Sequence, residues 1–272
     1  MISRNLALRL LVAVVFLPLL LYVFHVGGIV FLILVEALIV LSLWEFFTLT
    51  GIRLHLWQKL LLILLAAFPA ISVQYLQSRF LFESVIGVIF LVSLPHVFTR
   101  QLGDIGRSMA LATFAMLYLT IGFTSLILIR SGAVVNPEQA AGWVTFLFAS
   151  IWIIDTAAYY FGWQWGKKKL SPAISPNKTV VGFFGGFGGG ILTAGIFNFI
   201  FLTDVGFIRL IPSALVIAFF GQLGDLVESI FKREASVKDS SNLIPGHGGI
   251  LDRFDSLVFA APALLIYLRL AA

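Results

Sequence analysis

The sequence predicts an all-α polytopic integral membrane protein, because of its composition, its long apolar runs and the placement of its lysines and arginines. Of its 272 residues, 60% are hydrophobic and 11% are charged, and the mean hydropathy is +1.04. A soluble domain carries about 25% charged residues. Cysteine is absent, which excludes a disulfide framework and a thiolate metal site. A chain of this composition is expected to expose much of its surface to lipid.

Nine apolar runs have the length of a membrane-spanning helix, which needs about 20 residues to cross about 30 Å of hydrocarbon. The first run follows Arg4 and Arg9 and has no small-residue cleavage site after it, so we expect an uncleaved helix rather than a signal peptide. The seventh run is rich in glycine and the eighth ends in charged residues. The predicted spans are 8–26, 29–49, 57–76, 80–98, 109–129, 141–162, 183–203, 207–230 and 250–270.

The lysines and arginines predict the orientation. If the N-terminus is cytoplasmic, 14 of the 18 lysines and arginines lie in cytoplasmic segments, as the positive-inside rule requires. The two most polar loops then face the cytoplasm, where nucleotides are available. We therefore expect a multi-pass protein of the cell (inner) membrane with a cytoplasmic active site. The net charge of +5 also suits anionic lipid, and nothing in the sequence indicates nucleic-acid binding.

The polar chemistry is concentrated in the C-terminal half. We expect residues 1–140 to form transmembrane helices for packing, lipid access or dimerisation, and residues 141–272 to form the catalytic region. Glu36 and Glu45 lie in N-terminal apolar runs, and we expect structural roles for them, although an ionisable residue inside a membrane is a functional candidate by default. The last three or four helices should enclose a polar cavity that is open to the cytoplasm and laterally to lipid.

A glycine-rich stretch, GFFGGFGGG, opens the seventh predicted span. Its glycines at 182 and 186, 185 and 189, and 186 and 190 have the four-residue spacing that lets helix backbones approach closely. We therefore expect tight helix packing. A glycine cradle for phosphate is the alternative, but no P-loop lysine pattern follows the stretch.

Two carboxylate pairs have the three-residue spacing of one helix face, Asp225 with Glu228 and Asp252 with Asp255. Carboxylates at membrane depth must be paired or must coordinate a cation. Mg²⁺ typically binds one or two carboxylates together with substrate phosphates. The alternative is internal salt bridging to a nearby cation, and the spacing alone does not decide between metal binding and salt bridging. The nearby cations are Lys232, Arg233 and Arg253.

Between these pairs lie basic residues and a glycine turn, Pro245–Gly249, which leads into a helix start. Backbone N–H groups of such a turn at a helix N-terminus form an anion site. Acid pairs for a metal, cations for phosphate and a glycine turn together indicate phosphoryl or nucleotidyl transfer, which depends on positioning and charge neutralisation.

Residues 229–255 resemble the full signature of the phosphatidate cytidylyltransferases, or CDP-diacylglycerol synthases. The loop Ser175–Thr179, followed by Gly182, resembles the second motif of that family, and the segment 155–162 is similar to the one before it. One departure is that Val180 and Val181 stand where the family usually has an aromatic residue and then Glu or Gln. Any contribution of that acid is missing from this chain. The signature positions that match are Ser229, Phe231, Lys232, Arg233, Lys238, Asp239, Ser241, Ile244, Pro245, His247, Gly248, Gly249, Ile250, Asp252, Arg253, Phe254 and Asp255.

The resemblance implies that CTP and phosphatidic acid are converted to CDP-diacylglycerol and pyrophosphate in phospholipid biosynthesis, by a homodimer in the bilayer. Mg²⁺ is the implied cofactor, and a second cation is left open. The implied metal ligands are Asp225, Asp252, Asp255 and Glu228. The implied catalytic residues are Lys232, Arg233, Lys238, Asp239, His247 and Arg253. The implied substrate-binding residues are Ser175, Lys178, Thr179, Ser229, Gly248, Gly249 and Asp155.

Two other classes fit the composition. An anion transporter would have many helices with buried charges, but many transporters show a repeat that pairs two broken helices, and this sequence has no such repeat. A membrane transferase of the CDP-alcohol phosphotransferase type would need a differently spaced set of aspartates.

Overall fold

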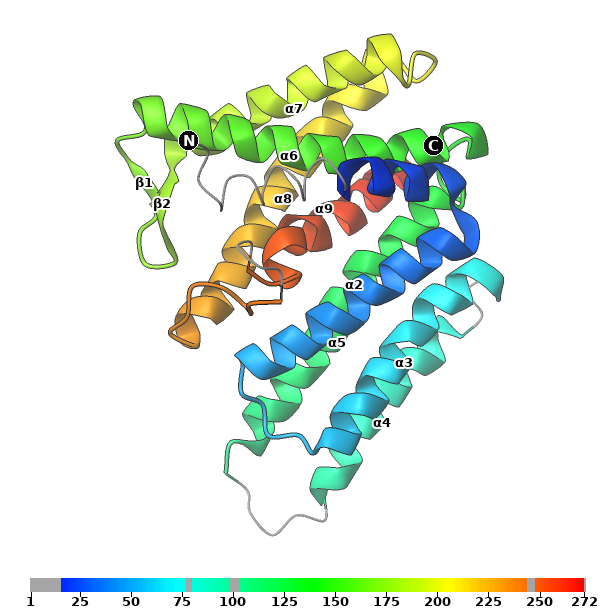
Figure 1. Ribbon diagram of the computed structural model, residues 1–272, viewed down its shortest axis with the longest axis vertical. Coiled ribbons are helices and arrows are strands. Elements are labelled where there is room, and N and C mark those ends of the chain that lie inside the picture. Colours follow the sequence, from blue (N-terminus) through cyan, green and yellow to red (C-terminus); the bar gives the residue numbers. More distant parts are fainter. Residues whose placement is uncertain (1–15, 77–79, 98–102, 244–247, 272) are drawn as a thin grey trace, which may run out of the picture. The chain divides into compact units, whose positions relative to one another are not determined.

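The computed structural model describes residues 16–76, 80–97, 103–243 and 248–271, and most of them are helical (Figure 1). A helical segment, Phe16–Val26, precedes the labelled elements. The helices are α2 (Gly28–Leu49), α3 (Leu56–Tyr75), α4 (Leu81–Val97), α5 (Ile105–Arg130), the short 3₁₀ helix η1 (Pro137–Gln139), α6 (Ala140–Trp165), α7 (Val180–Ile200), α8 (Phe207–Glu234) and α9 (Leu251–Leu270).

The predicted spans coincide with these helices to within a few residues, apart from the first, which is described only from residue 16. Within the described part of the chain, six helical segments are long and apolar enough to cross a membrane: α2, α3, α5, η1 with α6, α7 and α8. Helix α4 has 17 residues, and α9 carries Asp252, Arg253 and Asp255 in its first two turns. Several membrane-spanning helices are therefore present, and the nine-span topology stays a prediction.

A β-hairpin departs from the expected all-helical chain. Strands β1 (Lys169–Ser171) and β2 (Ser175–Thr179) pair antiparallel between α6 and α7, with Lys169 opposite Thr179. Proline explains this, because Ser171 and Ser175 each precede a proline, and that position disfavours helical backbone. The hairpin projects from the ends of α6 and α7 in Figure 1.

The chain divides into two compact units. The first comprises Met1–Ile127 and Glu234–Arg253, and the second comprises Leu128–Arg233 and Phe254–Ala272. In the first unit, α2 packs on α3 and α3 packs on α4, around buried side chains such as Phe31, Leu43 and Phe47. The functional division at residue 140 remains a prediction.

In the second unit, α6 and α7 lie side by side (Figure 1). A Cβ at Gly182 would lie 2.5 Å from the carbonyl oxygen of Ala158 on α6, and a Cβ at Gly189 would lie 2.8 Å from the Ala157 Cβ. On the other side, a Cβ at Gly190 would lie 3.1 Å from a carbonyl oxygen of α8. The prediction of tight packing is confirmed, because these glycines form a seam between two neighbouring helices.

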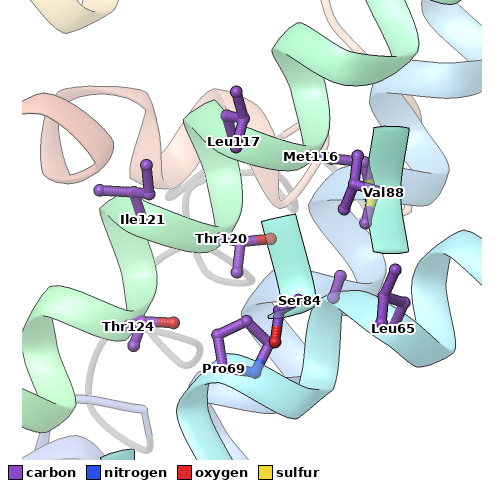
Figure 2. Close-up of a pocket in the computed structure, with 10 residues that line it drawn as sticks. Leu65, Pro69, Ser84, Val88, Met116, Leu117, Thr120, Ile121 and Thr124 are labelled. Carbon is purple, nitrogen blue, oxygen red and sulfur yellow. The ribbon is translucent and has the colours of Figure 1, made fainter. Parts of the chain in front are cut away.

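A small cavity of about 150 Å³ lies among α3, α4 and α5 in the first unit (Figure 2). Its lining is apolar apart from the hydroxyls of Ser84, Thr120 and Thr124. No charged side chain lines it among the residues whose positions are described. A cavity without charges does not suit a nucleotide or a phosphate.

Candidate functional site

A larger cavity, of about 630 Å³, lies in the second unit. It is bordered by α6, the hairpin, α7 and α8. Its lining combines charged, polar and aromatic side chains with three glycines. The residues that line it are Asp155, Ala158, Tyr159, Gly162, Trp163, Gly166, Lys169, Leu170, Asn177, Lys178, Thr179, Gly182, Phe183, Gln222 and Asp225.

An ion pair between the hairpin and α8 lies in the wall of this cavity. Lys178 Nζ, from β2, is 2.6 Å from Asp225 Oδ2, and the two side chains are 26% and 30% exposed. Ser229 lies one turn further along α8 and donates a hydrogen bond of 3.3 Å from Oγ to Asp225 Oδ1. The second family motif, through Lys178, and the start of the signature, at Ser229, therefore both contact Asp225. A charge-assisted contact of this kind fixes the lysine ammonium at the cavity surface.

Asp155 brings the third motif to the same place. It lies on α6 and lines the cavity, and the carboxylates of Asp155 and Asp225 are within electrostatic range of each other and of Lys178. Thr179 also lines the cavity, but its Oγ1 accepts a hydrogen bond of 3.1 Å from Gly182 N. Thr179 thus caps the N-terminus of α7, a role that the sequence analysis did not assign to it.

Glu228 and Lys232 form a buried ion pair one turn apart on α8. For Glu228 the structure thus shows the salt-bridge alternative. Asp255, on α9, is buried within electrostatic range of Asp225, Glu228 and Lys232, and its Oδ1 accepts a hydrogen bond of 2.6 Å from Ser256 N. These contacts give the second unit a set of carboxylates and lysines that interact with one another.

The charge balance of this set bears on cation binding. Four carboxyl groups, from Asp155, Asp225, Glu228 and Asp255, lie in this set together with two lysines, Lys178 and Lys232. Within the described ranges, no three Asp, Glu or His side chains form a preassembled metal site. Mg²⁺ needs only one or two carboxylates when phosphates and water supply its other ligands. The donor set therefore fits a divalent cation that binds together with a phosphate-bearing substrate.

Arg233 fastens the end of α8 to the hairpin. Its Nε donates a hydrogen bond of 3.0 Å to the carbonyl oxygen of Ile174, in the turn between the strands. Ser175, the next residue, begins β2. Arg233 thus holds the strand that carries Lys178, in addition to the phosphate contact predicted for it.

The segment Glu234–Arg253, in the first unit, contains the rest of the signature. Asp252 Oδ2 accepts hydrogen bonds from Ser240 N at 2.8 Å, Ser240 Oγ at 2.9 Å and Gly249 N at 2.8 Å. Gly248 has a φ of +81°, which glycine adopts readily. Asp252 therefore shapes the glycine turn, besides the metal contact predicted for it.

The remaining predicted residues are placed as follows. Lys238, Asp239 and Arg253 are exposed side chains of the first unit. His247 lies outside the described residues. The predicted metal set is divided between the units, with Asp225, Glu228 and Asp255 in the second and Asp252 in the first.

Two kinds of residue at these sites were not predicted from the sequence. Lys169 and Gln222 line the cavity, and Lys169 belongs to a lysine run that counted only toward orientation. Glu45 was expected to be structural, but its carboxylate accepts four hydrogen bonds from the signature segment. The available signal for Glu45 was its ionisable side chain in an apolar run.

The valines that depart from the family motif begin α7. Neither Val180 nor Val181 is among the described residues that line the cavity, although Thr179 and Gly182 on either side of them are. The two valines that depart from the family motif therefore do not form part of the cavity wall, which other residues line.

Comparison with known proteins gives a consistent result. A profile of the cytidylyltransferase family matches residues 7–271. A phosphatidate cytidylyltransferase of Bacillus subtilis (strain 168) is 36% identical over 273 residues, which cover 96% of this chain and 95% of that protein. One of Staphylococcus aureus (strain COL) is 35% identical over 261 residues, which cover 94% of each chain. One of Staphylococcus epidermidis (strain ATCC 12228) is 44% identical over 159 residues, which cover 58% of each. The chain belongs to the cytidylyltransferase family.

Proposed function

We propose that this protein is a phosphatidate cytidylyltransferase, which converts CTP and phosphatidic acid to CDP-diacylglycerol and pyrophosphate. The observation that supports this most is the pair between Lys178 and Asp225, because it joins the second family motif to α8 beside Ser229, the first residue of the signature, in the wall of one charged cavity. The relatives named above carry the same activity in their names. The apolar helices suit a lipid substrate.

In the proposed reaction, an oxygen of the phosphatidate phosphomonoester attacks the α-phosphorus of CTP. A new phosphorus–oxygen bond forms, the bond from the α-phosphorus to the α–β bridging oxygen breaks, and pyrophosphate leaves with the bonding electrons. The phosphomonoester has a second pKa of about 6, so it is ionised near neutral pH and needs no general base. Repulsion between two anionic substrates is then the barrier that the protein must lower.

The lysines of the cavity are suited to that task. Lys178 would hold a phosphate at the cavity wall, and Asp225 and Ser229 would keep its ammonium in place. Lys169 lines the same cavity and would add a second cation. Lys232 is buried against Glu228, so its charge would act on phosphate over a short distance in a medium of low polarity.

A divalent cation, Mg²⁺ in our proposal, would be held by Asp225 and Asp255 together with the triphosphate. When bound, such a cation neutralises the leaving pyrophosphate. The clustering of carboxyl groups in the second unit supports this assignment. An assay of pyrophosphate release can also test whether a second cation is needed.

The first experiment is pyrophosphate release by the purified full-length protein in detergent, with CTP, phosphatidic acid and Mg²⁺. We expect release to need all three, and chelation by EDTA to reduce it to background. Release that continues at the same rate in EDTA would overturn the assignment of Mg²⁺. The absence of release from folded protein would overturn the proposed reaction.

The same preparation can be reconstituted into sealed vesicles to test the transporter alternative. Uptake of CTP or phosphate without formation of CDP-diacylglycerol would favour a carrier. A mass of twice 29.9 kDa after correction for detergent would support the proposed homodimer, and a mass of 29.9 kDa would contradict it.

A further inference from the structure

Glu45 is a buried carboxylate near the end of α2, and all four of its hydrogen bonds run to the segment between Ser240 and Leu251. The side chain is 3% exposed. Its Oε1 accepts from Ser241 Oγ at 2.6 Å and from Ile250 N at 2.9 Å. Its Oε2 accepts from Ser240 Oγ at 3.1 Å and from Leu251 N at 2.8 Å. Each oxygen therefore takes one serine before the glycine turn and one backbone amide after it.

The two amides are the first N–H groups at the start of α9, which begins at Leu251. The first N–H groups of a helix have no partner within the helix, and they carry partial positive charge. A carboxylate from another helix satisfies two of them and is favoured by the helix dipole. Glu45 thus caps α9 from outside, with hydrogen bonds of the strong, charge-assisted kind.

Ser240 links Glu45 to the signature aspartate. Its hydroxyl lies 3.1 Å from Glu45 Oε2 and 2.9 Å from Asp252 Oδ2, so one hydrogen is shared between two carboxylates. The backbone N–H of Ser240 also donates to Asp252 Oδ2. A displacement of Glu45 would therefore displace the Asp252 carboxylate through the side chain of Ser240.

Gly249 is a glycine because of the same arrangement. A Cβ at this position would lie 2.6 Å from Glu45 Oε2 and closer still to Ser240 Oγ. Its own N–H donates to Asp252 Oδ2 at 2.8 Å. The glycine of the signature turn, its aspartate and Glu45 thus fit together as one buried polar network.

We propose that Glu45 is a positioning residue for nucleotidyl transfer: it holds Ser240, Ser241, Ile250 and Leu251 so that Asp252 and the Gly248–Gly249 turn are preorganised for the substrate phosphates. The carboxylate charge is essential, because a glutamine would present an NH₂ group to at least one backbone N–H donor and lose that bond. The inference rests on the proposed function for its effect on turnover, but not for its effect on the segment.

The test compares Glu45→Gln with Glu36→Gln. Glu36 lies on the same helix, and its carboxylate oxygens are buried without a hydrogen-bond partner among the described residues, so it is a matched control that makes no hydrogen bond to a described signature residue. We expect Glu45→Gln to lower kcat about 10- to 100-fold, as the loss of one or two charge-assisted hydrogen bonds implies. We expect Glu36→Gln to keep at least half of the wild-type kcat.

Hydrogen–deuterium exchange of each full-length protein supplies a readout besides activity. In Glu45→Gln, exchange across 240–252 should accelerate at least about tenfold, while α3 and α5 keep their protection. Acceleration spread through α3 and α5 would show a general packing role and overturn the proposal. An unchanged kcat in a folded Glu45→Gln protein would also overturn it.

Ser241→Ala is the second variant, and it decides the matter if Glu45→Gln does not fold. Ser241 Oγ donates to Glu45 and accepts a hydrogen bond of 3.1 Å from Leu243 N. We expect faster exchange across 240–252 and a lower kcat, and in the double variant a loss smaller than the product of the two single losses. Wild-type exchange and kcat in Ser241→Ala would contradict the proposal. If the wild-type protein itself releases no pyrophosphate, the proposed function fails, and the exchange data still test the contact.

Discussion

At the residue scale, the informative contact is that between Lys178 and Asp225. The sequence places the two residues 47 positions apart, Lys178 in the second family motif and Asp225 four residues before the signature. Only the folded chain shows that the ammonium and the carboxylate are 2.6 Å apart, with Ser229 on the second carboxylate oxygen. The acids also differ in their partners. Glu228 forms an ion pair with Lys232, whereas Asp255 is buried within electrostatic range of three ionisable groups.

We expect Asp225→Asn to lower kcat/KM for CTP about 100-fold or more, in the range seen when one preorganised electrostatic group is removed from an active site. The change keeps the size of the side chain but removes the charge that holds Lys178. Because both side chains are partly exposed, the unfolding temperature should change little. Steady-state pyrophosphate release measures the effect.

Asp204→Asn is the control, since Asp204 is an exposed acid of the same unit that does not line the cavity. It should behave as the wild type. An Asp225→Asn protein with more than a third of the wild-type kcat/KM would remove Asp225 from the site.

At the element scale, α7 shows why the chain needs so many glycines. Gly182, Gly185 and Gly189 lie against α6, and Gly186 and Gly190 lie against α8. The close approach brings the hairpin and the N-terminus of α7 beside Asp155 and Gln222, where they line the cavity together. The four-residue spacing was enough to predict the packing, because in a helix that spacing places residues on one face.

Gly182→Ala should destabilise the protein by about 1–3 kcal/mol, the usual cost of overpacking, because its Cβ would lie 2.5 Å from the backbone oxygen of Ala158. Gly188→Ala is the matched change on the same helix. A Cβ there meets nothing within 4 Å, so the better helix propensity of alanine should stabilise the protein by up to about 1 kcal/mol. Thermal unfolding in detergent measures both. Equal unfolding temperatures for the two variants would show that the seam does not constrain α7.

At the scale of the whole molecule, the signature contributes to both compact units. Residues 229–233 and 254–255 belong to the second unit, and residues 234–253 belong to the first. Orientation in the membrane is also a property of the whole chain. The excess of lysines and arginines predicts that the hairpin faces the cytoplasm and that the segment between α5 and α6 faces the other side.

The absence of cysteine makes this orientation directly testable. Ala133, between α5 and α6, and Ala173, in the hairpin turn, are both exposed, so each can be replaced by a single cysteine. A membrane-impermeant maleimide should label Ala133→Cys in intact cells and Ala173→Cys only after permeabilisation. The reverse pattern would invert the topology and place the hairpin outside.

The sequence by itself determined the class of the protein, the bounds of its helices to within a few residues, the packing glycines and the family. Each of these depends on composition, helical periodicity or local spacing, which the sequence contains directly. Only the tertiary structure decided that the proline-containing loop is a hairpin that delivers Lys178 to Asp225, that Glu228 is paired with Lys232, and that Glu45 caps α9. These contacts join residues from different elements, or they depend on which of several neighbouring groups pairs with a given carboxylate. Packing and burial determine the pairing, because a buried charged group needs a partner and the fold decides which groups lie near it.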